Sequence, residues 1–289
     1  MKKKVLLTGW KGFVGSNLLK IYKKKFNVVK LEKNIHLKKT FKKNFFNKKK
    51  LKFKSYDILI HCSYYTPNSY HSAEKQYKLN KIMRKNLNDL IVEYKIQTLI
   101  FMSSMSVYNT SKSKLVSEKT KLNKNTIYAR SKINDERNLF RLFKKKNDLK
   151  KVLILRLPGV VGKGSKNNFI SNLSKAIKKS KEFKINNIKF RFNNIIHVET
   201  LSRFIKYYID NNSNGFNVVN LGSVGAMPID NIVSFLISKL DKNYNKIIIR
   251  KSDKNPFRIN FNKARKTGFI PNSVENELKK YIKDLKKWE

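Results

Sequence analysis

The sequence predicts an α/β fold in which a doubly wound parallel sheet is followed by a smaller C-terminal lobe. Short apolar runs alternate with longer segments of helical spacing through the first half of the chain. Three glycines follow the first apolar run, and the alternation becomes irregular beyond residue 157. Strands that alternate with helices of this length form a parallel sheet with helices on both of its faces.

Five strands and three helices are predicted in the first half of the chain. The strands are short apolar runs at 5–7, 26–31, 57–60, 99–102 and 152–155. The helices have apolar residues three and four positions apart, over 13–22, 73–94 and 129–143. The stretch 38–54 carries aromatic and leucine side chains among many lysines, and we predict an amphipathic helix followed by a short strand there.

Lysine dominates the charge of this chain. Of its 289 residues, 56 are Lys and 10 are Arg, and the formal net charge is +47. Sequence-specific nucleic-acid recognition relies on the arginine fork, whereas the lysines here are dispersed along the whole chain. We therefore interpret them as a solvated surface that favours polyanionic ligands such as diphosphates, and we expect no specific nucleic-acid partner.

The sequence contains a single cysteine, Cys62, and no run of 18 apolar residues. One cysteine can form neither an internal disulfide nor a cysteine-based metal site, and no other group of residues has metal-ligand spacing. The apolar stretch after the N-terminal lysines is too short for a signal peptide. We therefore expect a cytoplasmic protein with no metal site and no membrane span.

A glycine-rich turn connects the first predicted strand to the first predicted helix. Gly9, Gly12 and Gly15 lie three positions apart there. One glycine permits a tight turn, one lets the backbone approach a pyrophosphate, and one lets strand and helix pack closely. The N-terminus of the helix then faces the phosphates. We predict a Rossmann-type dinucleotide site formed by Gly9, Gly12, Phe13, Val14 and Gly15.

The end of the second predicted strand bears on which dinucleotide binds. An acid at this point binds the adenosine ribose and repels a 2′-phosphate, and Glu32 is in that position. The neighbouring Lys33 has the opposite preference, so NAD is predicted and NADP is left open. Residues 1–157, with 201–225 returning to them, are predicted to be the dinucleotide-binding domain. Residues 158–200 and 226–289 are predicted to be the substrate-binding lobe.

Tyr128 and Lys132 lie four positions apart at the start of the third predicted helix, and therefore on one of its faces. A phenol has a pKa of about 10, which a neighbouring ammonium lowers toward the working range of an acid/base group. Ser104 follows a predicted strand, at the carboxyl edge where such sheets bind ligands, and its hydroxyl can hold a substrate oxygen. We predict Ser104, Tyr128 and Lys132 to be the catalytic residues.

Blocks of sequence along nearly the whole chain resemble the extended short-chain dehydrogenases/reductases of the NAD-dependent epimerase/dehydratase family. They are the turn 8–15, the segment 57–63, Asn80, the segment 101–108, Tyr128 with Lys132, and the segments 155–164, 194–198 and 262–271. The resemblance implies that Ser104 polarises a substrate oxygen, Tyr128 is the acid/base and Lys132 binds the nicotinamide ribose. It also implies that His61 and Cys62 lie beside the cofactor.

The chain departs from this family at positions that contact the substrate. Gly159 stands where many relatives have an asparagine, and Asn193 stands where an arginine commonly binds the nucleotide diphosphate. We assign substrate binding to Ser104, Asn168 and Arg191, the last as a substitute for that arginine. Met105 follows the active-site serine at the position where dehydrating and decarboxylating relatives have an acid. Because a thioether cannot transfer a proton, we expect neither dehydration nor decarboxylation of a nucleotide sugar.

The resemblance therefore implies an NAD(P)-dependent oxidoreductase that moves a hydride at a carbon of a nucleotide-linked sugar, as a 4-ketosugar reductase or a sugar epimerase. One alternative is a reductase of a small carbonyl compound that carries no nucleotide. The other alternative is a non-catalytic NAD(P)-binding scaffold, against which the retention of Ser104, Tyr128 and Lys132 argues. Assembly as a homodimer is left open.

Overall fold

The computed structural model describes residues 2–33, 46–67, 72–108, 114–211, 214–250 and 256–286. The chain divides into two compact units. The sheet unit comprises 1–109, 122–156 and 205–219, and the second unit comprises 110–121, 157–204 and 220–289. The expected division placed 110–121 with the sheet. The described part of this segment instead forms β6 (Leu115–Val116), which pairs in parallel with β15 (Arg258–Ile259) of the second unit.

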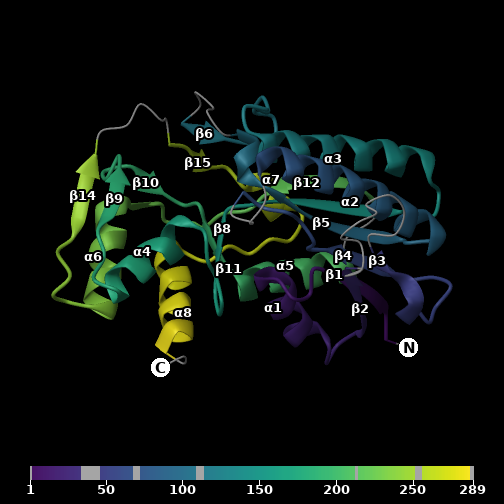
Figure 1. The fold of residues 1–289 in the computed structure, drawn as a ribbon, viewed down its shortest axis with the longest axis horizontal. Coiled ribbons are helices and arrows are strands. Elements are labelled where there is room, and N and C mark those ends of the chain that lie inside the picture. The colour runs from purple at the N-terminus through teal and green to yellow at the C-terminus, as the bar shows by residue number, and fades with distance from the viewer. Residues whose placement is uncertain are drawn as a thin grey trace. The chain divides into compact units, whose positions relative to one another are not determined.

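The sheet unit is built on a seven-stranded sheet with the order β12-β7-β5-β4-β1-β2-β3 (Figure 1). The strands are β1 (Lys4–Thr8), β2 (Asn27–Lys33), β3 (Phe46–Asn47), β4 (Ile58–His61), β5 (Thr98–Ser104), β7 (Lys151–Leu157) and β12 (Gly215–Asn220). β1 is parallel to both β2 and β4, and β4 is parallel to β5. The predicted doubly wound α/β fold is confirmed.

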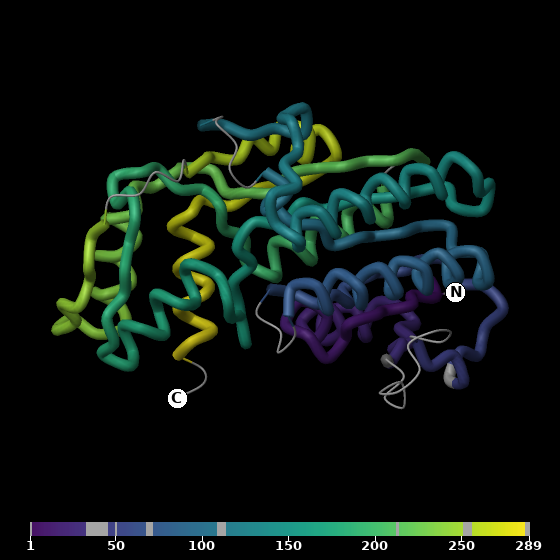
Figure 2. Tube along the Cα trace, turned by 45° about the horizontal axis from the view of Figure 1, so that its top comes forward, coloured from purple at the N-terminus to yellow at the C-terminus, as the bar shows by residue number. Residues whose placement is uncertain are grey.

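Helices cover both faces of this sheet. α1 (Phe13–Tyr22) connects β1 to β2, whereas α2 (Ala73–Glu93) and α3 (Ile127–Lys145) follow β4 and β5. These connections step in opposite directions along the sheet, so right-handed crossovers place α1 on one face and the α2/α3 pair on the other. Figures 1 and 2 show α2 and α3 running side by side. The side chains of Ser72 and Thr126 cap the first turns of α2 and α3.

The lysine-rich stretch 38–54, predicted as an amphipathic helix followed by a short strand, is described only in its second half. Residues 34–45 lie outside the described part of the chain. The remainder begins with β3, which is antiparallel to β2, and continues as a single 3₁₀ turn, Lys48–Lys50. The predicted helix thus falls largely on residues that the structure does not describe, and the part of the stretch that is described contains a short strand, β3, and no α-helix. Phe46 is 1 % exposed and joins the core that contains Leu31 and Leu59, so a long-range contact determines the local structure here.

The second unit combines helices with short pairs of strands. Its helices are α4 (Phe169–Lys178), α6 (Ile229–Leu240), α7 (Asn262–Lys266) and α8 (Val274–Lys286), and α5 (Val198–Asn211) has residues in both units. Besides β6 and β15, the strand pairs are β8 (Gly159–Val161) with β11 (Ile195–His197), β9 (Phe183–Asn186) with β14 (Ile247–Arg250), and β10 (Arg191–Phe192) with β13 (Met227–Pro228). Apolar side chains of α4, α6 and α8 form its core.

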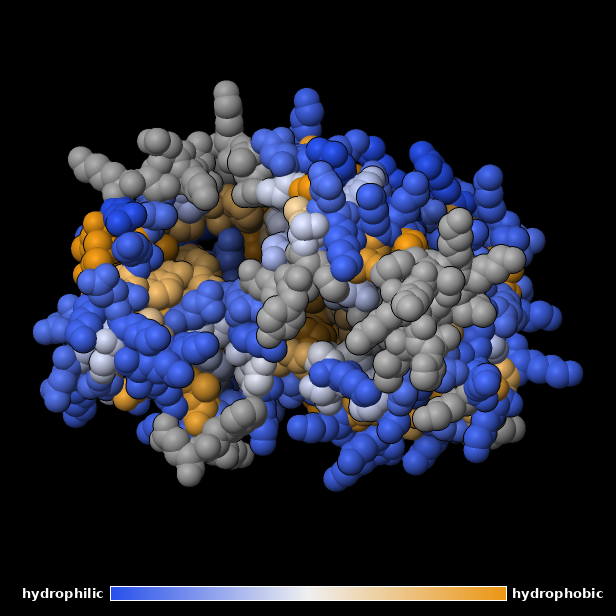
Figure 3. All heavy atoms as spheres, in the orientation of Figure 1, coloured by the Kyte–Doolittle hydropathy of each residue, from blue (hydrophilic) through white to orange (hydrophobic). Residues whose placement is uncertain are grey.

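Hydrophilic side chains cover most of the described surface in the view of Figure 3, in both units. They are spread across this face rather than gathered into one stripe, as expected for dispersed lysines. Among the described residues, no helix is both long and apolar enough to cross a membrane.

Candidate active site

The glycine-rich turn packs directly against the end of β4. Gly9 has a φ of +68°, and a Cβ at this position would lie 2.5 Å from the carbonyl carbon of Cys62 and from the amide nitrogen of Ser63. Only glycine combines this backbone conformation with so close an approach. β1 and β4 are neighbours in the sheet whose onward connections run in opposite directions, which is where such sheets bind ligands.

Gly12 and Gly15 differ in what surrounds them. A Cβ on Gly15 would lie 2.3 Å from the carbonyl oxygen of Gly9, so this glycine is required for the packing of α1 against the turn. A Cβ on Gly12 would have only that oxygen, at 3.3 Å, within contact distance. Gly12 is the N-cap of α1 and offers no side chain to the first N–H groups of the helix. These groups can therefore bind an anion, as the pyrophosphate site requires.

The remaining predicted cofactor residues surround this turn in the sheet unit. Phe13 and Val14 are the first two residues of α1 and are half-buried. Glu32 lies near the end of β2, where it is half-buried and opposite Asn47 of β3. Its place on β2, the strand that follows α1 and pairs with β1, agrees with the predicted ribose contact, which stays a prediction.

His61 supports the strand ends. Its Nδ1 is 2.9 Å from the hydroxyl of Thr8, and its ring stacks on Phe101 at a centroid distance of 5.7 Å. The ring is 2 % exposed, so it acts as packing between β1, β4 and β5. Cys62, the next residue, is half-buried and faces the ammonium of Lys132. Among the described residues, no three His, Cys, Asp or Glu side chains are placed to hold a metal ion.

The three predicted catalytic residues come together at the carboxyl end of β5. Ser104 ends this strand, and its side chain is hydrogen-bonded to the phenol of Tyr128 in the first turn of α3. Lys132 lies one turn further along α3, and its Nζ is 5.9 Å from the centroid of the Tyr128 ring. The spacing of four residues thus places both side chains on one face, toward the serine.

Burial is the largest influence on the pKa values of both Tyr128 and Lys132. It raises the pKa of Tyr128 to about 12, although the hydrogen bond with Ser104 lowers it. This direction is opposite to the one expected from the sequence, because burial outweighs the hydrogen bond. Burial also lowers the pKa of Lys132 to about 7, and the charges of Asp135, Glu136 and Cys62 oppose this effect. Lys132 is 3 % exposed, and its Nζ donates to the carbonyl oxygen of Met102 at 2.7 Å.

Two buried networks around the site were not anticipated from the sequence. In one, Tyr64 donates to Asp135 at 2.8 Å, and Asp135 also accepts from Arg84 at 2.9 Å. In the other, Glu136 binds Arg156 through both carboxylate oxygens, at 3.1 and 2.7 Å. The only local signal is the position of Asp135 and Glu136 one turn after Lys132 on α3.

Ser103 and Tyr108 complete the network of Glu136 and Arg156. Ser103 donates to Glu136 at 2.5 Å, and Arg156 donates to the hydroxyl of Tyr108. The network therefore ties α3 to the two neighbouring strands β5 and β7 and to the turn that follows β5. It holds the carboxyl end of β5, where Ser104 lies, in a fixed position relative to α3.

Two of the three predicted substrate residues, Asn168 and Arg191, lie in the second unit, whereas Ser104 lies in the sheet unit. Asn168 is the N-cap of α4, where its side chain accepts from Ser171 N at 2.9 Å and donates to Val160 O at 3.0 Å. Both ends of this amide are thus used in local structure. Arg191 lies on β10 and is exposed, so its guanidinium can reach an anion in solution.

The two departures from the family pattern have structural explanations. The Asn193 amide donates to and accepts from the backbone of Ile259, both at 2.9 Å, and holds β15 in place. This buried side chain cannot also bind a diphosphate. A Cβ on Gly159 would lie 3.2 Å from Asn194 O and 3.6 Å from the Asn168 Cβ, so neighbouring atoms occupy the space of a larger side chain.

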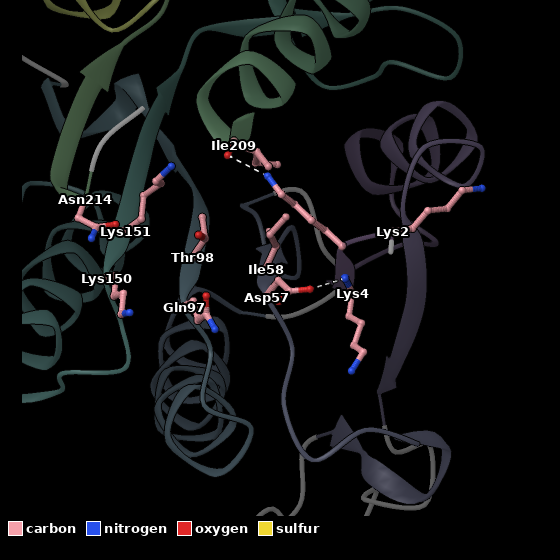
Figure 4. Close-up of a pocket in the computed structure, with 11 residues that line it drawn as sticks. Lys2, Lys4, Asp57, Ile58, Gln97, Thr98, Lys150, Lys151, Ile209 and Asn214 are labelled. Atoms are coloured by element: carbon pink, nitrogen blue, oxygen red, sulfur yellow. Dashed lines mark hydrogen bonds between the residues drawn. The ribbon is translucent and has the colours of Figure 1, made fainter. Parts of the chain in front are cut away.

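A cavity of about 480 Å³ lies at the opposite, amino-terminal edge of the sheet (Figure 4). Its lining includes Lys2, Lys3, Lys4, Lys150 and Lys151 together with Asp57. The ammonium groups do not converge. Figure 4 shows Lys2 and Lys4 pointing away from Lys150 and Lys151, and Lys3 Nζ is bonded to Ile209 O at 3.4 Å. The cavity is far from the strand ends that carry Ser104 and Gly9, and we assign it no role in the site.

Comparison with known proteins agrees with this geometry. The model of the NAD dependent epimerase/dehydratase family matches residues 5–222. A comparison with the sequences of curated proteins gave no match.

Three solved structures with similar folds are 17–19 % identical to this chain. The UDP-N-acetylglucosamine 4-epimerase of Methanobrevibacter ruminantium has a TM-score of 0.80 at 18 % identity, with both chains fully covered. The UDP-glucuronic acid 4-epimerase of Bacillus cereus, in complex with UDP-glucuronic acid and NAD, has a TM-score of 0.80 at 19 % identity over 99 % of this chain and 100 % of that one. The dTDP-glucose 4,6-dehydratase of Bacillus anthracis, in complex with NAD, has a TM-score of 0.75 at 17 % identity over 99 % and 97 %.

Proposed function

Because this chain belongs to the NAD-dependent epimerase/dehydratase family, we propose that it is an NAD(P)-dependent oxidoreductase acting on a nucleotide-linked sugar. The observation that carries the proposal is the group of Ser104, Tyr128 and Lys132 at the carboxyl end of β5. It lies in the same unit as the glycine-rich turn after β1. A turn built to bind a pyrophosphate and an acid/base group at neighbouring strand ends are the two parts that such chemistry needs.

The residues of the turn fit a dinucleotide. The N-terminus of α1 has no side-chain cap, and the space beside Gly12 is open except toward Gly9 O. Within the described residues, the buried hydroxyl of Ser63, which follows β4, has no hydrogen-bond partner and can serve a ligand at this edge. We assign the pyrophosphate to the Gly9–Gly15 turn, the adenosine ribose to Glu32 and the nicotinamide ribose to Lys132. When bound, NAD(P) accepts or supplies the hydride.

The chain's own residues move the accompanying proton. The Tyr128 phenol donates a proton to the sugar oxygen when a ketone is reduced, and it accepts one from the hydroxyl when an alcohol is oxidised. The Ser104 hydroxyl, which already bonds this phenol, is placed to hold the same sugar oxygen. Met105 is buried next to Ser104, and its thioether cannot transfer a proton, which argues against the loss of water from the sugar.

Nucleotide-linked sugars are proposed as substrates on two grounds. The similar solved proteins act on or bind such compounds by their names. Arg191 offers an exposed guanidinium in the second unit, where it can pair with a diphosphate. Asn168 can contribute only in addition to its capping role, since both ends of its amide are bonded.

We favour a 4-ketosugar reductase over an epimerase. An epimerase regenerates its cofactor on the enzyme and gains from holding it tightly, whereas a reductase exchanges it at each turnover. The strand that follows β2 is only Phe46–Asn47 and is antiparallel, so the described part of the chain has no long third parallel strand from which to contact the adenine. We therefore expect a dissociable cofactor.

The test has three measurements on the purified protein. NADH binding is followed by fluorescence titration, and turnover is measured with a panel of UDP-, dTDP- and GDP-linked sugars and ketosugars and with small carbonyl compounds. Turnover of small carbonyl compounds alone would favour the alternative reductase, and NADH binding without any turnover would favour the scaffold. Near-stoichiometric NAD⁺ released on denaturation, with sugar isomerisation in the absence of added cofactor, would favour the epimerase.

Tyr128→Phe separates the mechanism from mere folding. It keeps the ring but removes the proton, so kcat should fall by roughly 10²–10⁴-fold with nearly unchanged NADH affinity. Tyr207→Phe is the matched control, because this tyrosine is 45 % exposed on α5, and the variant should keep full activity. A fully active Tyr128→Phe enzyme would remove the proposed mechanism. Assembly as a homodimer stays a prediction, which sedimentation of the same sample would test.

A further inference from the structure

Tyr64, in the loop after β4, touches both side chains that the proposed function places in catalysis. The Nζ of Lys132 lies 3.2 Å from the centroid of the Tyr64 ring. The same ring makes a T-shaped contact with Tyr128, with centroids 5.7 Å apart and an angle of 81° between the rings. An ammonium over an aromatic face is attracted by the ring, most strongly where water is excluded. The ring thus provides a face on which the buried Lys132 ammonium rests.

The hydroxyl end of Tyr64 is held by a buried pair of charges. It donates to Asp135 Oδ2 at 2.8 Å, and Asp135 Oδ1 accepts from Arg84 Nη1 at 2.9 Å. The Asp135 side chain is 4 % exposed and that of Arg84 is 17 % exposed. Burial and the Asp135 charge raise the pKa of Tyr64, so its phenol stays protonated and keeps donating. The chain of contacts runs from α2 through α3 to the loop after β4.

We propose that Tyr64, Asp135 and Arg84 act as positioning residues that hold the Lys132 ammonium charged and fixed beneath Tyr128, and thereby set the pH range in which the site works. The inference rests on the proposed roles of Lys132 and Tyr128. None of the three positioning residues needs to touch cofactor or substrate. Tyr64 supplies the ring, Asp135 supplies the opposing charge, and Arg84 fixes the carboxylate.

Among the described residues, charged, titratable and other polar groups face Lys132 from three elements and one loop. From α3 it is faced by Tyr128, Asp135 and Glu136, and from the loop after β4 by Tyr64 and Cys62. β5 contributes the Met102 carbonyl oxygen and the Phe101 ring, whose centroid is 4.9 Å from Nζ. α2 contributes Arg84 through its bond to Asp135.

Of the two acids on α3, Asp135 is the one available to Lys132. Glu136 is already bonded by Arg156 through both of its oxygens and by Ser103. Among the described residues, the cation hydrogen-bonded to Asp135 is Arg84, and the Asp135 charge is the strongest influence opposing the fall in the pKa of Lys132 that burial causes. Loss of the Asp135 charge should therefore leave Lys132 neutral at a lower pH.

The single cysteine provides a reporter that needs neither cofactor nor substrate. Burial raises the pKa of the Cys62 thiol to about 12, and the Lys132 charge opposes this. Only the thiolate reacts with iodoacetamide, so the rate of Cys62 alkylation should rise with pH. At the pH where Lys132 loses its proton, the thiolate loses a stabilising charge, and the rate should rise less steeply above that pH. The rate is measured by intact-protein mass spectrometry across neutral and alkaline pH. The pH of the break reports the protonation of Lys132.

Asp135→Asn should move this break to lower pH by about one to three pH units, the usual effect of a close opposite charge. Tyr64→Leu, which removes ring and hydroxyl, should move it down by about one pH unit. Tyr64→Phe keeps the ring and should move the break less than Tyr64→Leu does. Arg84→Lys keeps the positive charge, so its alkylation profile should lie closer to that of wild type than the profile of Arg84→Met. Asp148→Asn, which removes an equal charge at an exposed position after α3, is the control and should leave the break in place.

The pH dependence of NADH affinity is measured on the same variants and should move in parallel. A wild-type profile without a break, or a break that stays in place in both Asp135→Asn and Tyr64→Leu, overturns the inference. Circular dichroism excludes variants that do not fold, and two substitutions on different elements keep the test decisive. If NADH does not bind at all, the proposed function fails, while the alkylation profile still decides the role of the three residues.

Discussion

Gly9 offers the sharpest test of how the candidate cofactor turn is built. A Cβ there would lie 2.5 Å from the backbone of both Cys62 and Ser63, and the residue has a φ of +68°. Gly9→Ala therefore adds two costs. The left-handed backbone conformation costs about 1–2 kcal/mol for alanine, and overpacking against backbone atoms that cannot rotate away costs about 1–3 kcal/mol more. The free energy of unfolding should fall by about 2–5 kcal/mol.

Gly225 separates the two costs. Its φ is +62°, but a Cβ there would meet only the Ser273 Cβ at 3.8 Å, which is ordinary contact. Gly225→Ala should therefore cost only about 1–2 kcal/mol. For domains of roughly this size each kcal/mol lowers Tm by about 2–4 °C, so Gly9→Ala should unfold about 4–20 °C below wild type and Gly225→Ala about 2–8 °C below.

Thermal unfolding followed by circular dichroism, with NADH titration of the folded variants, measures both effects. Gly12→Val is the functional counterpart, because Gly12 has an ordinary φ of −78° and meets only Gly9 O at 3.3 Å. It should keep the fold and weaken NADH binding sharply. The reasoning is refuted if Gly9→Ala is no more destabilising than Gly225→Ala, or if Gly12→Val binds NADH as wild type does.

Three further predictions follow from the same geometry. Arg156→Met leaves the buried Glu136 carboxylate without its arginine partner and should lower the free energy of unfolding by about 3–5 kcal/mol. Adding Glu136→Gln should recover part of this loss. Equal free energies of unfolding in urea for the single and the double variant would contradict the prediction. Burial lowers the pKa of Lys132 from 10.5 to about 7 in the folded state. Between these two pH values the unfolded chain binds more protons than the folded one, so the contribution of Lys132 to the free energy of unfolding rises with pH. Relative to wild type, Lys132→Met should therefore raise the free energy of unfolding more at neutral pH than above pH 10.5, as urea unfolding at both pH values would show. The same variant should weaken NADH binding and lower turnover. Glu32→Ala should narrow any preference for NAD over NADP in paired titrations, and a strong NADP preference in wild type would show that Glu32 is assigned wrongly.

The sequence alone determined the elements whose signals lie within short windows. The apolar spacing of 13–22 predicted α1 with the bounds that the structure has, and the strands β1, β4 and β5 lie where the apolar runs indicated. The three glycines of the turn and the spacing of four between Tyr128 and Lys132 are likewise signals that lie within a short stretch of sequence. A turn, a helix face and a buried strand are each decided by residues a few positions apart.

Only the tertiary structure decided which residues from distant parts of the sequence contact one another. Asp135 meets Tyr64 and Arg84 across 71 and 51 positions of sequence, and Asn193 meets Ile259 across 66. No periodicity indicates such pairs, because they depend on how strands and helices from different parts of the chain are brought together. Burial is likewise a property of the folded chain, which is why the pKa of Tyr128 is raised where the local sequence indicated that it would be lowered.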